Sequence, residues 1–276
     1  MRDFIKVGSR LFNFKISKRG HKLFKIHQVP VLETNFALIL ECQTTGEVAL
    51  IDAPEAESIL AKCDQLKLTP TKIFVTHHHG DHVDGIASLR KHFDLTVYGP
   101  MAEADLIPQL DIKVEPGAML KFGSGHLTVL SAPGHTSGHI AYFLPEQPTL
   151  FAGDALFSLG CGRMFDGPPD QMWQGLKRLR DLPDQTMLYC GHEYTLSNSA
   201  FAQTIDPDNP TLLLRVEQAQ AQIAAGYPTL PTLLSIEKLA NPFLRADQRI
   251  IAEKFGLSGT NPVKTFTALR KAKDQF

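Results

Sequence analysis

One short stretch, VTHHHGDHVDG at residues 75–85, constrains this chain more than any other part of its sequence. Four histidines and two aspartates fall within eight consecutive positions, although the chain of 276 residues holds only eleven histidines. The apolar run TKIFV directly precedes the histidines and is typical of a β-strand. Imidazole and carboxylate groups gathered in this way are typical of metal sites. The stretch therefore predicts a metal centre where a strand ends.

Further donors follow other predicted strands in the same way. His135 lies in a Pro-Gly loop after the run HLTVLSA (126–132), Asp154 follows the run TLFAG, and His192 follows TMLYC. Taken alone, Asp154 could equally be a helix cap with no role at the metal centre. His139 could likewise equally be a buried hydrogen-bonding residue. A catalytic zinc ion uses about three protein ligands, so the combined set is larger than one ion needs.

The composition of the chain changes at about residue 197. Short apolar or β-branched runs bounded by Gly, Pro or Asp alternate with occasional helices before that point, and helical stretches flanked by Pro, Asn or Gly follow it. The sequence predicts an α+β fold with an N-terminal extension (1–23), a β-rich domain (24–196) and a small all-helical domain (197–276). The expected strands are 35–41, 47–52, 71–77, 126–132, 140–144, 149–154 and 186–192, and the expected helices are 53–66, 168–182, 209–226, 232–240, 246–256 and 261–276.

Charge and apolar patterning exclude several classes of protein. A net charge of −1 argues against a nucleic-acid or membrane surface, and no apolar run approaches the length of a membrane span. The four cysteines form no CxxC pair, which favours a reducing, cytoplasmic compartment. The basic N-terminus lacks the apolar core of a secretory signal; a mitochondrial transit segment is the alternative to a solvated basic extension.

The motifs taken together resemble the metallo-β-lactamase superfamily, whose members carry T-H-x-H-x-D-H, a later G-H-T loop, an aspartate and a final histidine. THHHGDH, PGHTSGH, AGD and CGHEYT occur in that order within residues 29–196. CGRMFDG (161–167), CGHEYT and LRKAKDQF (269–276) are similar to the glutathione-binding segments of its glyoxalase II branch, the hydroxyacylglutathione hydrolases. The resemblance implies an αββα sandwich followed by a small all-helical C-terminal domain.

The same resemblance implies a dinuclear metal centre. The implied ligands are His77, His79 and His135 for a first ion, Asp81, His82 and His192 for a second, and Asp154 for both. Asp81 and Asp154 would be the catalytic carboxylates, and a hydroxide bridging the ions would attack the thioester of S-2-hydroxyacylglutathione. For S-D-lactoylglutathione the products are glutathione and D-lactate, the second step of methylglyoxal detoxification. Zinc is the expected ion, with iron or manganese as alternatives.

A glutathione-binding site is implied as well. Its implied contacts are Arg163, Phe165, His192, Tyr194, Arg270 and Lys273. Arg270 and Lys273 are three residues apart on a predicted helix, so they share a face, and this helix would fold back over the metal-binding edge. Two positions depart from the family pattern: Phe165 stands where many relatives have tyrosine, and Asp84 stands where a small residue is usual.

Two alternatives to a thioester hydrolase stay open at this point. A persulfide dioxygenase of the same superfamily would use a single iron ion, but that branch lacks the long helical C-terminal region. A non-catalytic metal-binding module would need only a closed set of about four ligands. The expected partner is a small-molecule glutathione thioester, and the expected oligomeric state is a monomer.

Overall fold

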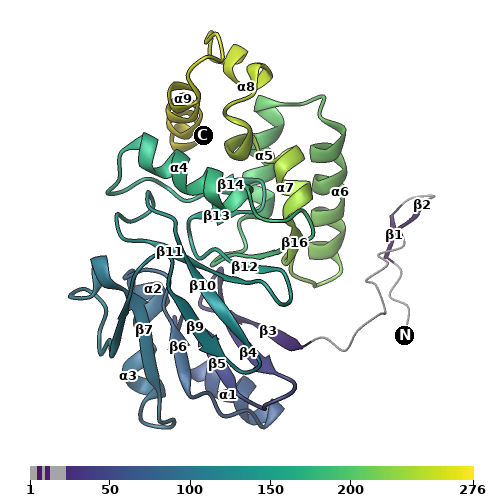
Figure 1. Ribbon diagram of the computed structural model, residues 1–276. Coiled ribbons are helices and arrows are strands. Elements are labelled where there is room, and N and C mark those ends of the chain that lie inside the picture. Colours follow the sequence, from purple (N-terminus) through teal and green to yellow (C-terminus); the bar gives the residue numbers. More distant parts are fainter. Residues whose placement is uncertain (1–4, 8–9, 13–22) are drawn as a thin grey trace.

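The computed structural model describes residues 5–7, 10–12 and 23–276 (Figure 1). Strands β1 (Ile5–Val7) and β2 (Arg10–Phe12) form a separate antiparallel pair, and the rest of the predicted N-terminal extension, apart from residue 23, lies outside the described residues. The body of the molecule contains two six-stranded sheets packed face to face, with helices over their outer faces. The predicted αββα sandwich is confirmed.

The first sheet joins an antiparallel half to a parallel half. Its order is β3 (Phe24–Val31), β4 (Asn35–Cys42), β5 (Val48–Ile51), β6 (Lys72–Phe74), β7 (Thr96–Pro100) and β8 (Ile112–Val114). Strands β3 to β5 pair antiparallel, whereas β5 to β8 pair parallel. Helices α1 (Glu57–Leu66) and α3 (Ile86–Leu89) cover its outer face, where Ile59 and Leu89 pack with buried Ile39 and Ile73.

The second sheet is antiparallel apart from one parallel pair, β12 with β15. Its order is β16 (Thr232–Leu233), β15 (Met187–Tyr189), β12 (Thr149–Phe151), β11 (Ile140–Leu144), β10 (Gly125–Ser131) and β9 (Met119–Phe122). Between the sheets the ring of Phe74 lies 5.6 Å from that of Tyr142 and 6.3 Å from that of Phe122. Tyr142 also donates a hydrogen bond to the carbonyl of Val75 at 2.7 Å, so apolar packing and a buried hydrogen bond both join the layers.

Helix α4 (Pro169–Arg180) and the C-terminal helices pack beyond the second sheet (Figure 1). The C-terminal elements are α5 (Thr195–Ile205), α6 (Pro210–Ala224), α7 (Leu234–Ala240), the 3₁₀ turn η2 (Pro242–Arg245), α8 (Arg249–Glu253) and α9 (Pro262–Gln275). Helix α6 begins as its sequence predicts, because Asn209 accepts hydrogen bonds from two backbone amides and Pro210 occupies the first turn. No helix within the described ranges is both long and apolar enough to cross a bilayer.

Three details of this region differ from the sequence prediction. The helix expected over 246–256 is limited to α8, Arg249–Glu253. Residues Thr232–Leu233, expected at the start of a helix, form strand β16 and extend the second sheet. Helix α5 was not predicted at all, and it spans the point at which the composition changes. The domain boundary near residue 197 therefore remains a prediction.

Candidate metal centre

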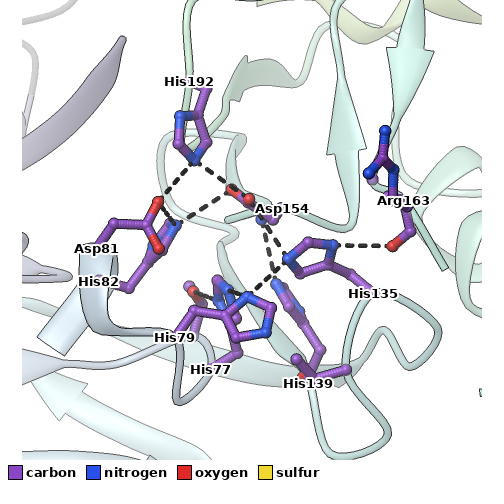
Figure 2. Close-up of polar contacts among 12 residues, drawn as sticks. His77, His79, Asp81, His82, His135, His139, Asp154, Arg163 and His192 are labelled. Atoms are coloured by element: carbon purple, nitrogen blue, oxygen red, sulfur yellow. Dashed lines mark hydrogen bonds and ion pairs between the residues drawn. The ribbon is translucent and has the colours of Figure 1, made fainter. Parts of the chain in front are cut away.

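The histidine-rich stretch leaves the first sheet directly after β6. His77 and His79 lie in the loop that follows this strand, and the short helix α2 (Gly80–Val83) carries Asp81 and His82. The remaining predicted ligands follow strands of the second sheet: His135 follows β10, Asp154 follows β12 and His192 follows β15. All seven predicted ligands meet at one edge of the sandwich (Figure 2).

Three imidazoles form the first cluster, His77, His79 and His135. The Nδ1 atom of His79 lies 3.1 Å from Nε2 of His77 and 3.0 Å from Nε2 of His135. Ligand atoms on a tetrahedral zinc ion are about 3.3 Å apart, so these nitrogens have the spacing that one ion needs. Burial lowers the pKa of all three imidazoles, most strongly that of His77, which favours the neutral form that binds metals.

Asp81, His82 and His192 form a second cluster. Burial opposes a charge on His82, but Asp154 and Asp52 outweigh burial and raise its pKa well above the usual value. For His192 burial likewise opposes the charge, yet hydrogen bonds with Asp154 and Asp81 raise its pKa to about 8. When no cation is bound, the protons on His82 and His192 provide positive charge that offsets the negative charge of the nearby carboxylates.

Asp154 faces both clusters. One carboxylate oxygen lies 3.3 Å from Nε2 of His82, and the other lies 3.2 Å from Nε2 of His192 and 3.5 Å from Nε2 of His135. Nε2 of His82 and Oδ1 of Asp154 are both buried and, although only 3.3 Å apart, form no hydrogen bond with each other or with another described residue. Buried polar atoms are rarely left in this way, so the pair fits a site whose natural occupant is a cation.

Residues that the sequence analysis did not identify hold several ligands in orientation. Asp52 accepts hydrogen bonds from Nδ1 of His82 at 2.8 Å and from Thr76, and Asn35 donates to Asp81 at 2.9 Å. Such partners fix the tautomer and direction of metal ligands. Asp52 follows strand β5 just as the predicted ligands follow theirs, and that position was the one signal in the sequence that could have identified it.

His139 has a related role behind the site. Its Nε2 accepts a hydrogen bond from the backbone amide of Asp154 at 3.1 Å, and its ring stacks on His77 with centroids 4.6 Å apart. The structure therefore favours the interpretation of His139 as a buried hydrogen-bonding residue.

A cavity of about 610 Å³ opens above the metal-binding edge, and all of the predicted glutathione contacts line it. Tyr194 stacks on the ring of His192, with centroids 4.6 Å apart and an interplanar angle of 7°. The side chain of Arg163 is 63% exposed, and its Nε lies 3.7 Å from Oδ1 of Asp274. Lys273 donates to the carbonyl of Ser197 at 3.3 Å and lies over the rings of Phe201 and Phe276. An exposed ion pair of this length contributes little, so both cations can still meet an anionic ligand.

Arg270 lines the same cavity but is held by the protein itself. The residue is only 5% exposed, and its guanidinium donates to the carbonyl of Cys161 at 3.0 Å and to Asp274 at 2.9 Å. Arg270 therefore connects α9 to the β13–β14 hairpin (Leu156–Phe157 and Gly160–Cys161) at the cavity wall.

The two departures from the family pattern lie in different surroundings. Phe165 is 57% exposed at the cavity and packs edge-on against His79 and His135, with centroids 5.7 and 5.3 Å apart. Asp84 is exposed and does not line the cavity, and a Cβ atom on Gly80 would lie 2.7 Å from its carboxylate. The altered side chain at 165 faces the cavity, whereas the one at 84 does not.

The cysteines near the site are poor nucleophiles. Burial raises the pKa of Cys161 to about 11 and raises that of Cys190 well above the usual value. Because the thiolate is the reactive form, neither residue offers an attacking sulfur at neutral pH.

Two protein families match consecutive parts of the chain. The metallo-beta-lactamase superfamily matches residues 30–192, and the family described as hydroxyacylglutathione hydrolase C-terminus matches residues 193–276. A hydroxyacylglutathione hydrolase of Ruegeria pomeroyi is 44% identical over 91% of this chain and 99% of its own length. One of Rhodopseudomonas palustris is 47% identical over 88% of this chain and 96% of its own length.

Solved structures share the fold. ETHE1 from Myxococcus xanthus has a TM-score of 0.65 at 26% identity and covers 90% of each chain. TTHA1623, described in a di-iron-bound form, has a TM-score of 0.57 at 27% identity and covers 80% of this chain and 100% of its own.

Proposed function

Because this chain belongs to the hydroxyacylglutathione hydrolase (glyoxalase II) family of the metallo-β-lactamase superfamily, we propose that it hydrolyses S-D-lactoylglutathione to glutathione and D-lactate. The arrangement that supports this proposal best is Asp154 between two donor clusters at the floor of a cavity with cationic walls. The monomeric state and the cytoplasmic location remain predictions.

The assigned ligands are the seven residues of the two clusters. His77, His79 and His135 would hold one divalent cation, Asp81, His82 and His192 a second, and Asp154 both. Such cations, zinc being the expected one, supply a water of near-neutral pKa and polarise a carbonyl oxygen. A thioester suits this site because its leaving thiol has a pKa of about 8.5 and departs without a proton donor.

The protein's other residues would bind and orient the substrate. Glutathione ends in two carboxylates, which the cations of Arg163 and Lys273 can meet at the cavity wall. Tyr194 and Phe165 add aromatic surface on either side of the clusters, where the thioester would lie. Phe165 also covers the edges of two ligand imidazoles, which limits their contact with water.

Two observations weigh against the alternatives. A mononuclear iron persulfide dioxygenase needs one ion, and the second cluster of Asp81, His82 and His192 would then have no role. A structural metal module keeps its site closed, whereas the cavity here leads to both clusters.

Removal of metal ions tests the proposal directly. Dialysis against a chelator should abolish hydrolysis of S-D-lactoylglutathione, and added Zn²⁺ should restore it. Refilling the site at pH 7 should also release protons beyond the one lost by a metal-bound water, because His82 and His192 carry raised pKa values and must lose their protons to bind a cation. Calorimetric titration in buffers of different ionisation enthalpy counts these protons.

The pH dependence gives this experiment an internal control. Above pH 8, the approximate pKa of His192, that imidazole is already neutral, so proton release should fall. Release of no protons at pH 7 beyond the one lost by a metal-bound water would contradict the second cluster. Activity that survives complete metal removal would overturn the hydrolytic mechanism.

Substrate binding is tested at two cations of the cavity wall, Arg163 and Lys273. Lys273→Ala and Arg163→Ala should each raise KM for S-D-lactoylglutathione by about tenfold and leave kcat within about twofold, because a charge-assisted hydrogen bond to a carboxylate contributes about 1.5–3 kcal/mol. Steady-state kinetics measure both constants. Lys271→Ala, an exposed change on the same helix outside the cavity, is the matched control. Unchanged KM in both cavity variants would place the glutathione carboxylates elsewhere.

A further inference from the structure

Glu103 is a buried carboxylate that no part of the proposed mechanism uses. It ends the 3₁₀ turn η1 (Met101–Glu103) and is only 2% exposed. Its Oε2 atom accepts hydrogen bonds from the backbone amide and Nδ1 of His78, both at 2.8 Å. Its Oε1 atom accepts one from the amide of Gly138 at 2.9 Å and one from the hydroxyl of Thr136. Each oxygen therefore serves a different loop.

These two loops carry the first metal-binding cluster. His78 lies between His77 and His79, and Thr136 directly follows His135. The second loop passes close to the Glu103 side chain, because a Cβ atom on Gly138 would lie 2.5 Å from its Cγ. One carboxylate thus fixes the position of one loop relative to the other.

We propose that Glu103 is a positioning residue that sets the separation of the three imidazoles in the first cluster. His78, the one histidine of the opening stretch outside the clusters, is a hydrogen-bonding partner of Glu103 and not a metal ligand. The inference rests on the assignment of the first cluster to a metal ion in the proposed function. Hydrogen-bonding partners of this kind typically change metal affinity or activity by about 10–100-fold when they are replaced.

Substitution of Glu103 by glutamine tests this role. Glutamine keeps the size of the side chain but has one acceptor oxygen, so it can serve only one loop. We expect the Kd of the first cluster for Zn²⁺ or Co²⁺, measured by titration of metal-free protein against a competing chelator, to rise by about 10–100-fold. The visible spectrum of the Co²⁺ protein should change, and kcat should fall while KM stays within about twofold.

A second buried carboxylate provides the matched control. Glu237 is fully buried and accepts hydrogen bonds from Ser158 at 2.8 Å and from the amide of Leu159 at 2.7 Å, none of them predicted ligands. Glu237→Gln should lower the melting temperature but leave metal affinity and the Co²⁺ spectrum unchanged. This comparison separates positioning of the cluster from stabilisation of the fold.

His78→Phe extends the test should Glu103→Gln fail to fold. This change removes only one of the four hydrogen bonds that Glu103 accepts, and the side chain of His78 is partly exposed. We therefore expect a smaller rise in the Kd for the metal ion, of about threefold to tenfold. Wild-type affinity and spectrum in a folded Glu103→Gln protein, or in His78→Phe if only that variant folds, would overturn the inference. Titration needs no substrate, so a wild-type protein that binds two ions but hydrolyses no glutathione thioester would contradict the proposed function alone.

Discussion

Replacement of Asp154 by asparagine should lower kcat for thioester hydrolysis by about a thousandfold, the largest effect we expect from a single substitution. The carboxylate lies within 3.5 Å of imidazole nitrogens from both clusters, so among the seven proposed ligands it is the side chain that would contact both ions. Asparagine keeps its shape but removes the charge. Stabilisation by bound cations is worth several kcal/mol, and each 1.36 kcal/mol changes the rate tenfold.

Metal analysis and steady-state kinetics on the same preparation measure this effect. The Asp154→Asn protein should hold fewer than two ions per chain. Asp84→Asn makes the same chemical change at an exposed position outside the cavity and should leave kcat within about twofold. A fully active Asp154→Asn protein, or a wild-type enzyme that reaches full activity with one ion, would contradict the dinuclear arrangement.

Deletion of residues 261–276 should prevent folding, and not merely weaken substrate binding. Phe266 and Leu269 on α9 are fully buried, and the ring of Phe266 lies 6.1 Å from that of Trp173 on α4. Loss of two such side chains costs about 5–10 kcal/mol, which is comparable to the whole stability of a typical domain, about 5–15 kcal/mol. The deletion also removes Arg270 and its hydrogen bonds to the cavity wall.

Thermal unfolding and solubility of the shortened chain measure the effect of the deletion on folding. Deletion of Phe276 alone, an exposed residue, should leave the melting temperature nearly unchanged. A shortened chain that melts like the full protein and binds both ions, with only KM raised, would show that α9 serves the substrate and not the fold.

The metal-binding edge could be predicted because its ligands follow a simple rule. His77, His135, Asp154 and His192 each come within a few residues of the end of a short apolar run, and strands that end at one edge of a sandwich bring such residues together. Asp81 and His82 were identified from the histidine-rich stretch, but the short helix α2 that carries them was not predicted. Local patterns were sufficient for these residues because each depends on its own strand.

Other parts of the structure depend on contacts between distant segments. Helix α5 has the sequence TLSNSAFAQTI, rich in residues of low helix propensity, and it is helical because Phe201, Ala202 and Ile205 are buried against the neighbouring elements. Glu103 lies in a stretch that looks like an exposed loop, and its partners are 25 and more residues away. Arg270 was expected to bind substrate, yet its guanidinium contacts carbonyls more than 100 residues away. Such long-range pairings leave no local pattern.

Each donor cluster takes residues from both layers of the sandwich. The first sheet supplies His77 and His79 to a group that His135 completes from the second, and His192 likewise completes the group containing Asp81 and His82. No fragment limited to one layer contains a complete cluster, so ions bound as proposed would load only after the two sheets have docked. Such ions would act as cross-links that oppose separation of the layers. At a hundredfold excess of free metal over Kd, each would add about 2.7 kcal/mol to the free energy of unfolding. The order of assembly is thus the reverse of that in a zinc finger, where the metal ion brings the fold together.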